Sequence, residues 1–312
     1  MGGWFKGFWL GGKSRYIMVG QSLNGMRMHP PYRVDRPRRI LTPVVVASPH
    51  SGRHYPAEFL RASVLDERAI RSSEDAFMDM LVEEAPRLGA PVIAAEYPRA
   101  WLDLNRSPEE MDPAVVEGVG RVVQTPRISS GLGVIPRVVA NGRAIYRGKL
   151  SRAEAEARIA QVWRPYHGAL DGLLGEAEAE FGESVLLDFH SMPHEALDSV
   201  SRPGQRRPEV VLGDRFGASA SGEIVEALEA GFAAEGLCVI RNAPFAGAFV
   251  TQHYGRPSRG RHAVQVEIDR SLYMNERTLR PNADFDAVKR IVTRVIERVI
   301  AARPGRVALA AE

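Results

Sequence analysis

The chain has 312 residues, of which 45% are hydrophobic and 25% charged, and its formal net charge at pH 7 is +3. These values are ordinary for a globular protein, and the length predicts one large α/β domain. The arginines are scattered, and no basic stripe with interleaved aromatic residues is present, so we expect no nucleic-acid binding. A single cysteine excludes an internal disulfide, which fits a reducing, cytoplasmic compartment.

The beginning of the chain differs from the rest. Residues 1–10 are apolar and rich in glycine, but they lack the hydrophobic core and the cleavage site of a signal peptide. No apolar run approaches the length of a membrane span, so we expect no membrane partner. Met26 and Met28 precede the first convincing strand. We therefore expect residues 1–30 to be a loosely ordered extension or to follow a misplaced start codon, and residues 31–305 to form the domain.

The first strong strand is predicted over residues 44–47, where three valines precede an alanine. It runs into the turn Pro49-His50-Ser51-Gly52, which places a histidine at the end of a strand. His50 could be a ligand in a site or an ordinary surface residue of a turn. This stretch alone favours neither interpretation.

Residues 65–88 are predicted to be helical. A serine pair can cap the helix, and Glu74 and Asp75 would then lie in its first turn, where the macrodipole favours anions. Asp75 and Asp79 are spaced i, i+4, which would place both on one face. The acidic pair either compensates the dipole or directs Asp75 or Glu74 into a site as a ligand.

The next strand, predicted over residues 91–97, leads into a short polar segment. Arg99, Asp103, Asn105 and Arg106 lie there among apolar neighbours. An arginine can hold a carboxylate through a bidentate fork, with an asparagine assisting. The alternative is a salt bridge from Arg106 to Asp103 that orders the loop. The two flanking arginines favour anion recognition.

Residues 107–150 are rich in glycine and proline and are predicted to form a long loop layer near the site, with Arg137 as a second anion contact. Its two glycines around Leu132 lack a phosphate-loop or dinucleotide pattern, so nucleotide binding is not expected. A helix or helix pair follows over residues 151–181, where Ser151-Arg152-Ala153-Glu154 fits a capping box.

The apolar run of residues 185–187 continues into Asp188, His190 and Ser191. This is the pattern of a buried strand that delivers polar side chains at its carboxyl end, where ligands bind in open α/β sheets. His190 is therefore a second candidate ligand. Asp188, two residues earlier, could orient such a ligand from behind.

The strand predicted over residues 262–270 places Gln265, Glu267 and Asp269 on one face and apolar residues on the other. A glutamate in such a strand is costly unless it is paired, which makes Glu267 the best general-base candidate.

Residues 195–212 are predicted to be a loop. Further helices are predicted over residues 218–236 and 284–302, with a short strand beginning at residue 239 and a loop over residues 244–251.

Strands and helices thus alternate along the chain. This order predicts an α/β fold with a single domain, in which helices flank a mostly parallel mixed sheet.

Two histidines at strand ends and an acidic pair could form a catalytic zinc site, which usually has three protein ligands and a water. Zinc would make that water more acidic and would polarise a scissile carbonyl. The chain has no HExxH and no paired CxxC motif, so the prediction of a zinc site rests on the two histidines and the acidic pair taken together.

Five segments, in this order, resemble the signature set of the N-formylglutamate amidohydrolase family, and the resemblance covers residues 40–300. They are Pro49-His50-Ser51-Gly52, Asp103-Leu104-Asn105-Arg106, Asp188-Phe189-His190-Ser191-Met192-Pro193, Tyr254-Gly255, and Gln265-Val266-Glu267-Ile268 with Leu272-Tyr273-Met274. The resemblance implies a zinc-carboxypeptidase-like (phosphorylase/hydrolase-like) fold and zinc-dependent hydrolysis of the amide of a small anionic N-acyl amino acid. The leading substrate is N-formyl-L-glutamate, which gives formate and L-glutamate, in histidine degradation or in salvage.

The resemblance also implies residue roles. His50, Asp75 and His190 would bind zinc, with Glu74 as the alternative to Asp75, and Glu267 would be the general base. The substrate carboxylates would bind the residues Arg106, Asn105, Arg99 and Arg137.

Two departures from the pattern stand out. The carboxypeptidase-like pattern has a ligand glutamate three residues after the first histidine, where this chain has Arg53. The segment Gly247-Ala248-Phe249 replaces a Gly-Gly-Tyr-like one in a loop expected to touch the substrate.

Three other functions remain open at this point. The chain could act on another N-acyl amino acid or a peptide, because a fold does not fix a substrate. It could also be a carboxylate-binding protein without metal. A cofactor-free hydrolase using Ser51 or Ser191 is less favoured, since no GxSxG elbow is present. We expect a monomer or a homodimer.

Overall fold

The computed structural model describes residues 5–10, 13–18, 29–120 and 125–303. The strands are β1 (Phe5–Leu10), β2 (Lys13–Met18), β3 (Tyr32–Arg36), β4 (Val44–Ser48), β5 (Val92–Ala95), β6 (Ser184–Met192), β7 (Val210–Gly213), β8 (Val239–Arg241), β9 (Arg261–Asp269), β10 (Met274–Asn275) and β11 (Arg280–Pro281). The α-helices are α1 (Ala57–Ala62), α2 (Glu67–Ile70), α3 (Met78–Leu81), α4 (Pro126–Ser129), α5 (Arg152–Arg158), α6 (Arg164–Phe181), α7 (Gly222–Ala234), α8 (Phe249–Tyr254) and α9 (Phe285–Ala302).

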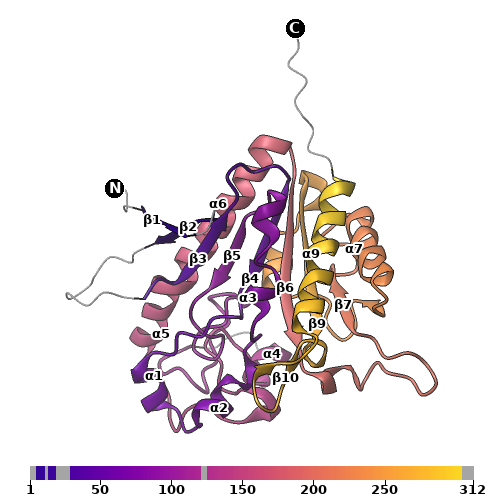
Figure 1. The fold of residues 1–312 in the computed structure, drawn as a ribbon. Coiled ribbons are helices and arrows are strands. Elements are labelled where there is room, and N and C mark those ends of the chain that lie inside the picture. Colours follow the sequence, from indigo (N-terminus) through magenta and orange to yellow (C-terminus); the bar gives the residue numbers. More distant parts are fainter. Residues whose placement is uncertain (1–4, 11–12, 19–28, 121–124, 304–312) are drawn as a thin grey trace.

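Within the described residues, nine strands form one sheet in the order β1-β2-β3-β5-β4-β6-β9-β7-β8 (Figure 1). The central strands β5, β4, β6 and β9 run parallel to one another. The pairs β1–β2, β2–β3, β3–β5 and β7–β9 are antiparallel. The prediction of one mixed α/β sheet flanked by helices is confirmed, and its parallel part lies at the centre.

Part of the prediction for residues 1–30 lies outside the described residues. Residues 5–10 and 13–18 form β1 and β2, and β2 pairs with β3. The domain bounds of 31–305 stay a prediction.

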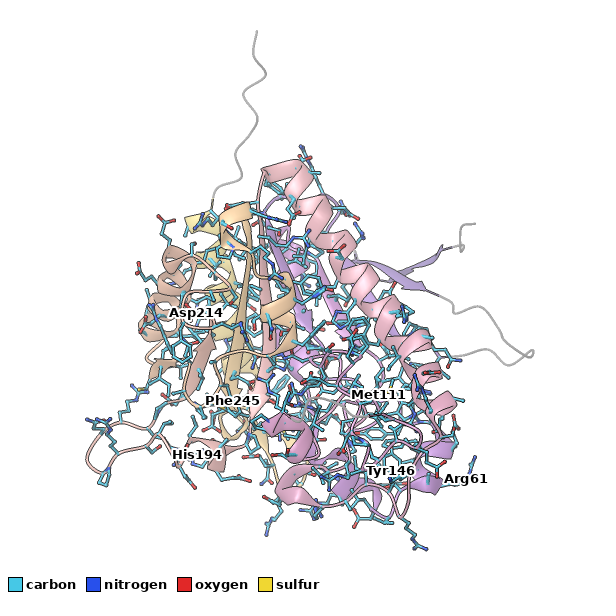
Figure 2. The ribbon with its side chains drawn as sticks, turned by 180° about the vertical axis from the view of Figure 1, so that it is seen from behind. Arg61, Met111, Tyr146, His194, Asp214 and Phe245 are labelled. Atoms are coloured by element: carbon cyan, nitrogen blue, oxygen red, sulfur yellow. The ribbon has the colours of Figure 1, made fainter. Side chains whose placement is uncertain are left out.

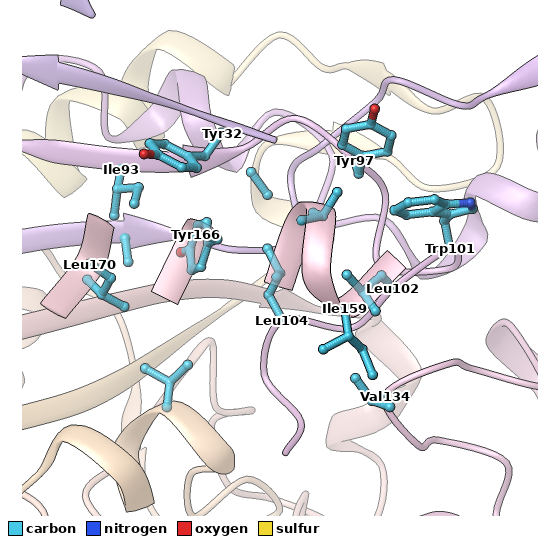
Figure 3. Close-up of a cluster of buried hydrophobic side chains, with 14 of the residues drawn as sticks. Tyr32, Ile93, Tyr97, Trp101, Leu102, Leu104, Val134, Ile159, Tyr166 and Leu170 are labelled. Carbon is cyan, nitrogen blue, oxygen red and sulfur yellow. The ribbon is translucent and has the colours of Figure 1, made fainter. Parts of the chain in front are cut away.

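The two faces of the sheet pack against different helices. Alternation along β6 sends Val185, Leu187 and Phe189 into a core shared with α7 and α9, and sends Leu186 into the core on the opposite face, under α6. Figure 3 shows Tyr166 and Leu170 of α6 against the strands on that second face. Since Asp188 and His190 follow Leu186 at the same spacing, they lie on the α6 face, beyond its apolar part.

Residues 99–150 cover that part of the α6 face. Apolar side chains anchor this loop layer beneath α5 and α6, among them Trp101, Leu102, Leu104, Val134 and Ile159 (Figure 3). The amide of Asp103 donates to Val134 O at 2.9 Å, which joins two stretches of the layer. The long loop layer predicted over residues 107–150 is confirmed: its described residues contain only the short helix α4 and one short 3₁₀ turn.

The predicted helix over residues 65–88 is wrong. The chain forms α2, a 3₁₀ turn (Arg71–Ser73), α3 and a second 3₁₀ turn (Ala85–Leu88) instead. Glu74 is extended, and Phe77 has a left-handed φ of 66°, so no continuous helix passes through Asp75. The reason is tertiary: the amide of Asp75 donates to His50 O at 3.0 Å, which draws this segment onto the end of β4.

Two predicted loops also contain short elements. β7 begins within residues 195–212, and α8 begins within residues 244–251. Strands of four residues and helices of six are too short for a periodic pattern to reveal. Among the described residues, no helix is long and apolar enough to cross a lipid bilayer.

Packing of α9 on α7 generates a stability prediction. Ile296 is fully buried between these helices and the sheet, so Ile296→Ala should leave a cavity and lower the free energy of unfolding by about 2–5 kcal/mol. Its neighbour Glu297 is exposed, and Glu297→Ala should change that free energy by less than about 0.5 kcal/mol. Urea unfolding measures both variants. Equal stability of the two would contradict the packing described here.

Candidate metal centre and active site

The candidate site lies at the carboxyl ends of the central strands. His50 follows β4, His190 belongs to β6, and Glu267 is the register partner of His190 on β9. Asp75 reaches the same place from the irregular segment before α3. Figure 1 shows this end of the sheet beside α1, α2, α4 and β10.

Three buried donor atoms face one another there. His190 Nδ1 lies 3.1 Å from His50 Nδ1 and 3.2 Å from Asp75 Oδ2. His50 Nδ1 and Asp75 Oδ2 are 3.5 Å apart. None of the three residues is more than 2% exposed. The atoms form a nearly equilateral triangle of almost fully buried side chains.

The opposite nitrogens of the two histidines are held by carboxylates. His50 Nε2 lies 2.7 Å from Asp103 Oδ1, and His190 Nε2 lies 2.9 Å from Asp188 Oδ2. Because a carboxylate only accepts, each Nε2–H donates, and each neutral ring keeps a lone pair on Nδ1. The Nδ1 lone pairs of His50 and His190 and the Oδ2 atom of Asp75 then face one another, and no hydrogen atom lies between them. Three electron-rich atoms in this arrangement favour a bound cation.

Charge at the site points the same way. Burial alone lowers the pKa of His190, but the neighbouring carboxylates of Asp188 and Asp75 outweigh it and raise that pKa well above its usual range. Burial raises the pKa of Asp75, yet the adjacent imidazoles of His190 and His50 and the charge of Arg270 hold it well below its usual range. A field that retains a proton on an imidazole also attracts a metal cation.

The donor set fits zinc. Tetrahedral zinc with nitrogen and oxygen ligands at its normal bond lengths has ligand atoms about 3.3 Å apart, and the three edges of the triangle bracket this value. The carboxylates behind both rings match the usual support of ligand histidines. His50, Asp75 and His190 therefore form a buried group that could hold a metal ion.

The other acidic and basic residues of this region point elsewhere. The carboxylate of Glu74 accepts from Arg71 Nε at 2.9 Å and from Tyr55 at 3.1 Å. Arg53, three residues after His50, donates to Asp79 Oδ2 at 2.5 Å. Asp75, rather than Glu74, completes the triangle with the histidines.

Glu267 lies beside the triangle with 7% of its surface exposed. Its burial, with the charge of Asp75, raises its pKa above the usual range, although His190 and Arg99 oppose the shift. Gln265 Nε2 donates to Glu267 Oε1 at 2.7 Å, which leaves Oε2 for another partner. An elevated pKa suits a carboxylate that must take up and release a proton.

The site opens into a cavity of about 650 Å³. Its lining includes His50, Arg99, Asp103, Asn105, Arg106, Arg127, His190, Phe245, Gln265, Glu267 and Arg270. Figure 2 shows Phe245 and His194 at this end of the molecule. Arg137 is not among the lining residues, since its guanidinium pairs with Asp112 at 3.0 Å. Its predicted role as a substrate contact stays a prediction.

The arginines of the cavity differ in their partners. Arg99 pairs with Asp103 at 2.9 Å. Arg106 donates to two backbone carbonyls, and Arg127 donates to Gly247 O. Among the described residues, neither Arg106 nor Arg127 has an acidic partner. Burial and the charges of Arg99 and Arg127 lower the pKa of Arg106, although the charges of Asp103 and Glu110 oppose the shift. Two neighbouring guanidiniums without a direct acidic partner favour an anionic ligand.

The side-chain amide of Asn105 is engaged in hydrogen bonds within the protein. Its Oδ1 accepts from the amide of Val250 at 2.8 Å, and its Nδ2 donates to Gln265 Oε1 at 3.2 Å. The same Nδ2 lies 3.4 Å from His190 Nε2. His167 stabilises the same segment, with Nε2 at 2.9 Å from Leu104 O.

The sequence analysis did not assign Arg127, Gln265 or Arg270 to the site. Gln265 shares the face of Glu267, and Arg270 directly follows that strand, so alternation and position were available signals. Arg127 lies in a loop, where no spacing rule predicts proximity.

Ser51 and Ser191 have no histidine partner among the described residues. Ser51 Oγ bonds to Ser48, and Ser191 Oγ donates to Asp75 Oδ1 at 3.2 Å. A nucleophilic serine needs an adjacent base, so the geometry gives no support to a cofactor-free serine hydrolase.

Comparison with known proteins agrees with the resemblance in the motifs. An N-formylglutamate deformylase of Pseudomonas aeruginosa is 32% identical over 275 residues, covering 85% of this chain and 95% of the relative. One of Pseudomonas putida is 31% identical over 242 residues, covering 75% and 82%.

Solved structures agree as well. The crystal structure of an N-formylglutamate amidohydrolase from Ralstonia eutropha has a TM-score of 0.81 and 34% identity, covering 87% of this chain and 97% of its own. A gene product of Agrobacterium tumefaciens, 17% identical with a TM-score of 0.61 and covering 87% and 94%, shares the fold. Residues 42–274 match the N-formylglutamate amidohydrolase family as a whole, and the chain belongs to that family.

Proposed function

We propose that the protein is a zinc-dependent amidohydrolase that converts N-formyl-L-glutamate to formate and L-glutamate. The observation that carries the proposal is the buried triangle of His50, Asp75 and His190 beside Glu267, in a cavity with two guanidiniums that lack acidic partners. The names of the Pseudomonas relatives and of the Ralstonia structure supply the substrate.

The metal would be held by His50 Nδ1, His190 Nδ1 and one oxygen of Asp75. When bound, it supplies a Lewis acid that polarises the formyl carbonyl and makes an attacking water more acidic. Asp103 and Asp188 keep the two imidazoles in the tautomer that presents Nδ1.

Glu267 performs the proton transfers in this proposal. Its Oε2 takes the proton of the attacking water, and the same carboxyl group then gives a proton to the departing amine of glutamate. Gln265 fixes Oε1, so the reactive oxygen is defined. Arg99, whose charge is coupled to Asp103, Asp75 and Glu267, can stabilise negative charge that develops on the carbonyl oxygen.

Arg106 and Arg127 would bind the carboxylates of the substrate. N-Formylglutamate carries two carboxylates, and the cavity offers two guanidiniums that no described acidic residue neutralises. Asn105, which also lines the cavity, can assist Arg106, its neighbour in the chain. The match in charge favours a dicarboxylic acyl amino acid over a neutral one.

Metal content tests the ligand set. Asp75→Ala and His190→Ala should each lose most of the bound zinc and nearly all turnover, because a three-ligand site cannot spare one ligand. Glu74→Gln should keep both, because its carboxylate faces Arg71 and Tyr55. Elemental analysis with an assay for released formate measures these outcomes. Full zinc and turnover in Asp75→Ala would refute the assignment.

Glu267→Gln tests the general base. The amide keeps the size of the side chain but cannot take up a proton, so kcat should fall by about 10²–10⁴-fold. Zinc content should stay at the wild-type level, since Glu267 is not part of the triangle. A variant that loses its metal, or that keeps its kcat, would contradict this role.

Substrate analogues test Arg127. A charged hydrogen bond to a carboxylate is worth about 1.5–3 kcal/mol, so Arg127→Gln should lower kcat/KM for N-formyl-L-glutamate by about 10–100-fold. It should lower kcat/KM for N-formyl-L-glutamine much less if Arg127 binds the side-chain carboxylate. Arg152→Gln is the matched control outside the cavity, because Arg152 pairs with the exposed Glu156, and it should leave both values unchanged. Equal losses for the two substrates would contradict the assignment.

A further inference from the structure

Arg270 connects three parts of the site. It is the first residue after β9 and is 5% exposed. Its Nη2 donates to Asp75 Oδ1 at 3.0 Å, and its Nε donates to Ser191 Oγ at 3.0 Å. Its Nη1 donates to Ser72 O at 3.1 Å. The guanidinium thus joins the ends of β9 and β6 to the segment that carries Asp75.

The two oxygens of Asp75 have different neighbours. Oδ1 accepts from Arg270 and, at 3.2 Å, from Ser191 Oγ. Oδ2 faces Nδ1 of His190 at 3.2 Å and Nδ1 of His50 at 3.5 Å. One oxygen is therefore occupied by donors from the protein, and the other points at the two imidazoles.

Asp75 needs such support more than the histidines do. His190 lies on a central strand, and His50 directly follows another, so the sheet fixes both backbones. Asp75 lies between a 3₁₀ turn and the residue Phe77, whose φ is 66°. Its side chain must be oriented by partners, because no regular element orients it.

We propose that Arg270 and Ser191 are positioning residues that hold Asp75 as a metal ligand through the single oxygen Oδ2. This inference rests on the metal site proposed above. With Oδ1 engaged, Asp75 cannot bind through both oxygens, and a coordination position stays open for water or the substrate carbonyl. Loss of either partner would let the carboxylate rotate and would weaken the site.

Arg270 lines the cavity, so a direct contact with substrate is the competing role. Bidentate binding of a carboxylate needs a free edge of the guanidinium with two N–H groups. In Arg270 all three nitrogens already donate to the protein. In Arg106, Nε and Nη1 donate to carbonyls, while Nη2 has no partner among the described residues. The geometry favours Arg106 for substrate and Arg270 for Asp75.

The test uses Ser191→Ala and Arg270→Lys in the full chain. Neither changes the net charge, so any effect reports geometry rather than electrostatics. The rate and equilibrium of zinc transfer to a chromophoric chelator give the metal affinity, and KM and kcat are measured with saturating zinc. We expect each variant to bind zinc about 10–100-fold more weakly, with little change in KM and with kcat largely recovered by excess zinc.

Arg71→Lys is the matched control, because Arg71 pairs with Glu74, the residue adjacent to Asp75. It should bind zinc like the wild type. Wild-type zinc affinity in Ser191→Ala and Arg270→Lys would overturn the inference, and so would a raised KM at unchanged affinity, which would assign Arg270 to substrate. Should Arg270→Lys fail to fold, Ser191→Ala alone decides, since it removes one hydroxyl.

The same experiment separates this inference from the proposed function. A wild-type protein that binds no zinc refutes the metal site itself. A wild-type protein that binds zinc and releases formate, with both variants unaltered, refutes only the positioning role.

Discussion

Buried negative charge is the constraint on which the site depends. Asp75, Asp103, Asp188 and Glu267 are each at most 7% exposed, and they lie within one end of the sheet. Burying a carboxylate is very costly unless it is paired or hydrogen-bonded. Two histidines and the arginines at positions 99 and 270 supply most of the compensation. A divalent cation within the triangle would complete it, which explains why these donors can remain buried together.

The parallel centre of the sheet makes this concentration of charge possible. Because β4, β6 and β9 run side by side in fixed register, His190 and Glu267 are neighbours by pairing rather than by loop conformation. The opposite faces of the same strands are largely apolar and pack on α7 and α9. The free energy gained from that burial supports the polar face, where carboxylates are brought together against their mutual repulsion.

The strand-borne half of the site follows from the sequence because a two-residue period fixes which side chains share a face. His190 and Glu267 could be found in this way, and so could the mixed sheet that carries them. The conformation of the segment around Asp75 could not be predicted in this way, since a serine pair followed by acidic residues is also typical of a helix start. Only the bond from the amide of Asp75 to His50 O decides its backbone, and that contact spans 25 residues of chain. Arg127 was missed for the same reason: its place is set by tertiary packing.

The cavity thus combines two kinds of charge balance. At its metal end every described acidic side chain has a hydrogen-bond donor, and the three ligand atoms still lack a cation. At its other end, the described partners of Arg106 and Arg127 are carbonyl oxygens, and the two guanidiniums still lack an anion. A ligand that satisfies both must place a polarisable carbonyl at the metal and carboxylates at the guanidiniums. An acyl amino acid with an acidic side chain has this distribution, whereas a neutral acyl amino acid would leave one guanidinium uncompensated in a poorly solvated place.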